Sequence, residues 1–87
     1  MNPKTVEEWR AYIATLSGPD LLSKAIAANS VAFVRSLETD GLGPFEVHEV
    51  LLTFARRIEA DGQILPARTT GAFLDYGVFL HPVALNP

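Results

Sequence analysis

Apolar residues recur at helical spacing near the start of the chain. The first stripe has intervals of three and four residues and consists of Val6, Trp9, Ile13 and Leu16. Thr5 and Glu8 fit the capping box that opens a helix. Gly18 suits the left-handed position that ends a helix, and Pro19 suits the first turn of the next one. The pattern predicts a first helix at about residues 5–17.

The following stretch predicts one long helix at about residues 19–38. Its main stripe consists of Leu22, Ile26, Phe33 and Leu37. Further apolar and small residues widen this surface to most of the circumference, which is typical of a helix at the centre of a fold. Asn29 falls inside the stripe, where a buried amide needs a partner. We expect Asn29 to bond to a neighbouring helix or a buried water, to set the register of a helix–helix interface, or to contact a ligand.

A third helix is predicted at about residues 44–61, after the break at Asp40–Pro44. Its core stripe is the most regular in the chain and consists of Val47, Val50, Leu51, Phe54, Ala55 and Ile58. Residues 31–41 align with residues 52–62, and both segments end in Asp-Gly. Two units are too few for a repeat array, so we interpret the echo as two amphipathic helices that end in the same way; the alternative is a pseudo-symmetric helical pair.

The last part of the chain is less regular. Residues 63–68 read as an extended connector, and a short helix is predicted at about residues 70–80. Gly77 weakens that helix, so Val78–Leu80 are equally compatible with an extended chain. The predicted fold is a single all-α domain over residues 1–87, a compact bundle of three main helices plus a short C-terminal helix.

Composition excludes several classes of protein. With 87 residues and 48% hydrophobic residues, the chain is one folded domain and not a disordered segment. The absence of cysteine excludes disulfides, thiolate metal sites and a cysteine nucleophile. The net charge is −3 and the cations are scattered, so nucleic acid is not the expected partner. No apolar run is long enough to span a bilayer and no signal peptide is recognisable, so we expect a cytoplasmic protein without a membrane partner.

The search for chemical motifs predicts no catalytic, metal-binding or cofactor-binding residue. His48 and Glu49 begin an H-E-x-x-H pattern, but Leu52 stands where the second histidine is needed. Paired carboxylates lie at predicted helix ends, where a solvated position or the helix dipole explains them. A helix-turn-helix with its turn at residues 40–43 would present Glu46 and Glu49 to DNA phosphates, which repel them. We therefore expect a protein that is not an enzyme.

The C-terminal segment holds more apolar side chains than a filled three-helix core needs. In residues 71–87 only Asp75 is charged. Apolar side chains left exposed in one patch usually mark an interaction site. The predicted protein-binding residues are Phe73, Tyr76, Phe79, Leu80 and Val83, together with Asn29. The alternative is that the segment is only a lid on the core.

These observations favour a non-enzymatic protein–protein interaction module. It would be a small acidic accessory or inhibitory protein, or one that associates with itself as an oligomer, so its partner is another protein or a second copy. The alternatives are a DNA-binding helix-turn-helix domain and a helical domain that binds a small ligand in an apolar pocket.

Overall fold

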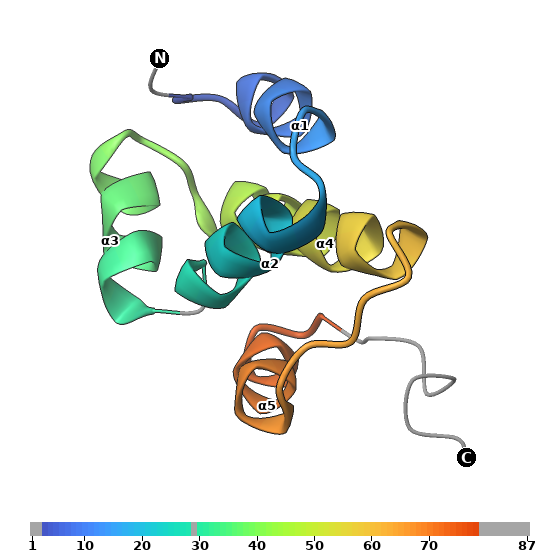
Figure 1. Cartoon of the computed structure of the whole chain (residues 1–87). Helices are drawn as coiled ribbons and strands as arrows, with labels where there is room; N and C mark the ends of the chain where they lie inside the picture. Colours follow the sequence, from blue (N-terminus) through green and yellow to red (C-terminus); the bar gives the residue numbers. More distant parts are fainter. Residues whose placement is uncertain (1–2, 29, 79–87) are drawn as a thin grey trace.

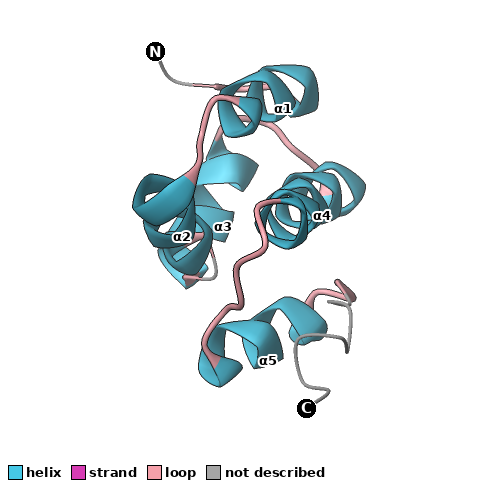
Figure 2. Ribbon diagram, turned by 45° about the vertical axis from the view of Figure 1, so that its right-hand side comes forward, coloured by secondary structure: helices cyan, strands magenta, loops and turns pink. Residues whose placement is uncertain are grey.

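A computed structural model describes residues 3–28 and 30–78 of the chain. Within these residues the helices are α1 (Val6–Ala14), α2 (Gly18–Ala27), α3 (Val31–Thr39), α4 (Pro44–Ala60) and α5 (Ala67–Asp75). Helices α1, α2 and α3 each pack against α4, which lies at the centre (Figure 1). Helix α5 lies on the side of α4 away from α1 (Figures 1 and 2). The all-α prediction is confirmed, with five helices in the described part of the chain instead of four.

The core is built around α4. Its predicted stripe is confirmed, since the following residues are all buried: Val47, Val50, Leu51, Phe54, Ala55 and Ile58. Ile13 of α1, Leu21 of α2 and Leu37 of α3 are also inaccessible to solvent and belong to the same hydrophobic cluster. Each surrounding helix therefore contributes to one continuous core.

The prediction of one helix over residues 19–38 is wrong, because α2 and α3 are separate helices. The hydroxyl of Ser30 accepts the N–H of Phe33 at 3.0 Å and caps the start of α3. The buried residues on either side of the break explain it. They are Leu21, Ala25 and Ala28 before it, and Val34 and Leu37 after it. At about 100° per residue, these two sets fall on nearly opposite faces of a straight helix. Only a break lets both sets reach the core.

Three helices end in the same way. The residue after each C-cap is a glycine with positive φ: Gly41 (+94°), Gly62 (+72°) and Gly77 (+76°). The next N–H then folds back onto a carbonyl of the last turn, from Leu42 to Leu37, from Gln63 to Ile58 and from Val78 to Phe73. This is the Schellman motif. The motif confirms the interpretation that residues 31–41 and 52–62 end in the same way. Helix α5 ends with the same motif.

The predicted bounds of the other helices need smaller corrections. Helix α1 is shorter than residues 5–17, and α4 ends one residue before the predicted residue 61. The Thr5 hydroxyl accepts the N–H of Glu8 as predicted, but the Glu8 carboxylate accepts the N–H of Lys4 instead of that of Thr5. Helix α5 begins before residue 70, within the predicted connector, and stops where Gly77 turns left-handed.

A polar contact that the sequence did not predict ties α2 to the end of α4. The Asp61 carboxylate accepts the N–H of Gly18 at 3.1 Å and the side-chain amide of Gln63 at 2.7 Å. The same amide group of Gln63 donates to the carbonyl of Gly18 at 2.9 Å. These bonds satisfy backbone groups at the start of α2.

Candidate functional site

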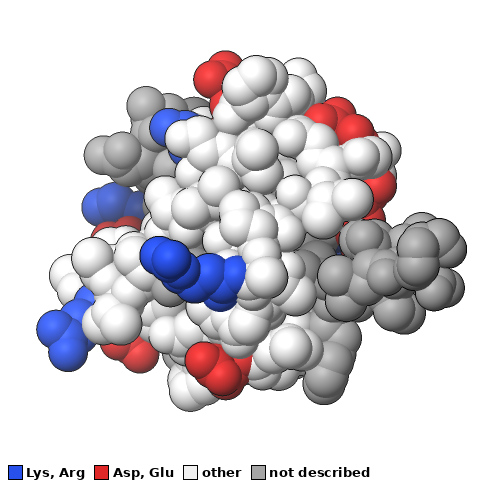
Figure 3. All heavy atoms as spheres, turned by 60° about the horizontal axis from the view of Figure 1, so that its bottom comes forward, with Lys and Arg blue, Asp and Glu red and all other residues white. Residues whose placement is uncertain are grey.

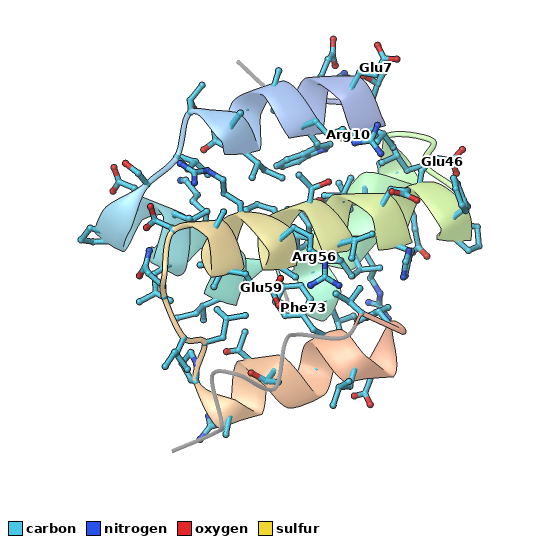
Figure 4. All side chains as sticks on the ribbon, turned by 90° about the vertical axis from the view of Figure 1, so that its right-hand side faces the viewer. Glu7, Arg10, Glu46, Arg56, Glu59 and Phe73 are labelled. Atoms are coloured by element: carbon cyan, nitrogen blue, oxygen red, sulfur yellow. The ribbon has the colours of Figure 1, made fainter. Side chains whose placement is uncertain are left out.

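Helix α5 is anchored to the core by its inner side. Phe73 and Val78 are completely buried, and Leu65 and Thr69 are nearly so. Figure 4 shows Phe73 between α5 and α4. The expectation that Phe73 lies on an accessible surface is therefore corrected, because the Schellman ending folds Val78 back toward Phe73 and both enter the core. For this side chain the lid interpretation holds.

Other side chains of α5 stay at the surface. Leu74 is 45% exposed, and Tyr76 at the C-cap is half-buried. Helix α5 also carries two exposed residues of opposite charge, Arg68 and Asp75. On the face that Figure 3 shows, charged groups lie among the uncharged atoms. The structure thus leaves an apolar part of α5 accessible, although Phe73 is not part of it. The other predicted binding residues, Asn29, Phe79, Leu80 and Val83, lie outside the described residues.

His48 has a structural contact with the end of α5. Its Nε2 lies 3.3 Å from the carbonyl oxygen of Gly77, so the bond requires a proton on Nε2. This contact fastens the C-terminal end of α5 to α4. Within the described residues, no group of three or more acidic, histidine or cysteine side chains is arranged to hold a metal ion.

The end of the molecule where α1 and α4 begin is acidic. Glu7, Asp40 and Glu46 line a depression of about 500 Å³ together with Lys4. Figure 4 shows Glu7 and Glu46 at the same end of the molecule. The Glu46 carboxylate also accepts the N–H of Gly43 and so caps α4. Carboxylates at this position repel phosphate, which argues against a helix-turn-helix that reads DNA with the start of α4.

A groove of about 400 Å³ runs between α1 and α4. Arg10 of α1 pairs with Glu49 of α4 across it, at 3.2 Å. The Arg56 guanidinium pairs with Glu59 at 2.6 Å on the surface of α4. Within each pair the positive and the negative charge compensate one another. The groove therefore offers no strong electrostatic attraction to an ionic partner.

An aromatic hollow of about 210 Å³ lies among the first four helices. The aromatic side chains in its wall are Trp9, Tyr12, Phe33 and Phe54. Their ring centroids are 5.3 to 6.3 Å apart in the four contacting pairs. Sequence reasoning missed this site, because it assigned Trp9, Phe33 and Phe54 to separate core stripes. The alignment of Phe33 with Phe54 in the internal echo was the available signal.

Comparison with known protein families, with curated proteins and with solved structures gave no match for this chain. In the described part of the chain, no helix combines the length and apolar character needed to cross a bilayer.

Proposed function

We propose that this protein is a non-enzymatic interaction module that docks through its α5 side. The observation that supports this proposal is the exposed apolar surface of α5, where Leu74 is 45% exposed and Tyr76 is only half-buried. Apolar surface is enriched at the centre of interfaces, where charged residues are depleted. An accessory, inhibitory or self-associating protein would use such a surface.

A second copy of the chain is the first partner to test. The exposed charged residues of α5 are one cation and one anion, Arg68 and Asp75, so the helix presents no net charge that would select a partner of one sign. In a two-fold dimer the same patch meets itself, and a patch whose exposed charges, Arg68 and Asp75, are of opposite sign does so without net repulsion. The chain as a whole carries a net charge of −3, which disfavours contact between two copies through their acidic ends.

The test is the molar mass in solution, measured by light scattering over a range of concentrations. We expect the mass to rise from 9.5 kDa toward twice that value. Leu74→Asp should hold the chain at the monomer mass, because it places a charge in the patch. Phe45→Asp is the matched control, since Phe45 is 71% exposed but lies beside Glu46 at the acidic end. A Leu74→Asp variant that associates as strongly as the unmodified chain would exclude the α5 side as the interface.

A further inference from the structure

The aromatic hollow has the features of a ligand site that is separate from the α5 side. We propose that it binds a small aromatic carboxylate, with the ring of the ligand against the aromatic wall and its carboxylate at Lys24. The hollow is lined by residues of four helices, namely α1, α2, α3 and α4. A site assembled from four helices is held in place by the packing of the whole domain.

The wall of the hollow suits one aromatic ring. Trp9 meets Phe33 edge to face at 5.3 Å and meets Tyr12 edge to face at 5.8 Å. All three of these rings are only partly buried, so they keep surface available to a ligand. The volume of about 210 Å³ exceeds the roughly 150 Å³ of a cavity that holds benzene. It is below the roughly 300 Å³ at which sites for larger ligands begin, which limits the ligand to one ring and a short polar group.

Lys24 carries the charge among the residues that line the hollow, and the hydroxyl of Tyr12, which also lines it, can donate or accept a hydrogen bond. Lys24 lines it and has no salt bridge with the described residues. The indole N–H of Trp9 is buried and has no hydrogen-bond partner in the part of the chain that is described. Such a group is unfavourable without an acceptor. Because this nitrogen is closed to solvent, we expect the carboxylate of the ligand to contact Lys24 and not the indole N–H.

The charge of Lys24 decides between two kinds of ligand. Aromatic walls also attract cations through their ring faces. An ammonium ligand in this hollow would meet the like charge of Lys24, whereas a carboxylate meets the opposite charge. The combination of an aromatic wall with the cationic side chain of Lys24 therefore favours an anion.

Trp9 is the only tryptophan of the chain and forms part of the wall, so its fluorescence reports on the hollow directly. The experiment titrates the full chain with phenylacetate and, separately, with phenethylamine, which has a similar ring and the opposite charge. We expect phenylacetate to change the fluorescence saturably, with a Kd on the order of 1 mM for so small a ligand. Phenethylamine should bind at least about tenfold more weakly, because its ammonium group is repelled by Lys24.

Three variants locate the binding. Lys24→Gln should weaken phenylacetate binding about fivefold or more, whereas Arg68→Gln, at an exposed position of α5, should leave it unchanged. Ala27→Leu should abolish binding, because Ala27 lines the hollow and is exposed enough to accept a larger side chain without loss of the fold. Circular dichroism checks that fold. A fluorescence response that does not saturate, equal affinity for both probes, or full binding by a folded Ala27→Leu variant would overturn the proposal.

Discussion

Replacement of Phe73 by alanine tests whether α5 is anchored in the core. Phe73 is completely inaccessible to solvent and belongs to the hydrophobic cluster that the described residues form. Truncation of a fully buried phenylalanine to alanine costs about 3–5 kcal/mol of stability. A domain of 87 residues has about 4–13 kcal/mol in total, so the variant should lose a large part of it. At about 4–8 °C per kcal/mol, its Tm should fall by at least about 12 °C.

The assay is urea unfolding followed by far-ultraviolet circular dichroism and by the fluorescence of Trp9. Trp9 lies in α1, so its transition reports on a part of the molecule on the other side of α4 from α5. Leu74→Ala is the matched control, because the neighbouring side chain is 45% exposed and should cost less than about 1 kcal/mol. If Phe73→Ala is no more destabilising than Leu74→Ala, then Phe73 is not part of the core and its assignment to an accessible surface stands.

Four further variants test single hydrogen bonds or single glycine positions, each measured by urea unfolding. Asp61→Ala should lower the stability by about 1–2 kcal/mol, because the N–H of Gly18 loses its acceptor; an unchanged stability would mean that this bond does not hold α2. Ser30→Ala should cost about 1 kcal/mol through the lost cap of α3, and no loss at all would contradict the capping role. In α5, Gly71→Ala should stabilise by up to about 1 kcal/mol, since nothing lies within 4 Å of the added methyl group. At Gly77, where φ is +76°, the same change should destabilise by about 1–2 kcal/mol. If the Gly71→Ala and Gly77→Ala variants changed the stability equally, the left-handed conformation assigned to Gly77 would be wrong.

The helices with one strong stripe were predictable, while the break between α2 and α3 was not. The stripe of α4 has a regular spacing and a clear start and end, so local pattern and tertiary packing agree. In residues 19–38 small apolar residues cover most of the helical circumference, which hides the change of the buried face. Ser30, three residues before Phe33, was the one local sign of a new helix.

The candidate sites depend on contacts between distant residues. Phe73 was placed at the surface because the apolar C-terminal residues were treated as one surplus set. Phe73 and Val78 stand at the same spacing as Leu37 and Leu42, and in each pair a glycine directly precedes the second residue. Comparison of the two pairs would have predicted that Phe73 and Val78 are buried. The aromatic hollow needs side chains from four helices at once. Helical periodicity within single segments carries no information about such an assembly.

Cross-linking through position 74 tests the α5 interface most directly. The chain contains no cysteine, so Leu74→Cys and Phe45→Cys each introduce a single reactive thiol. With a short bifunctional maleimide, Leu74→Cys should form covalent dimers rapidly, because two α5 sides face each other in the complex. Phe45→Cys, at the acidic end, should stay monomeric. Equal yields for the two variants, or dimers formed through Phe45→Cys alone, would contradict docking through α5.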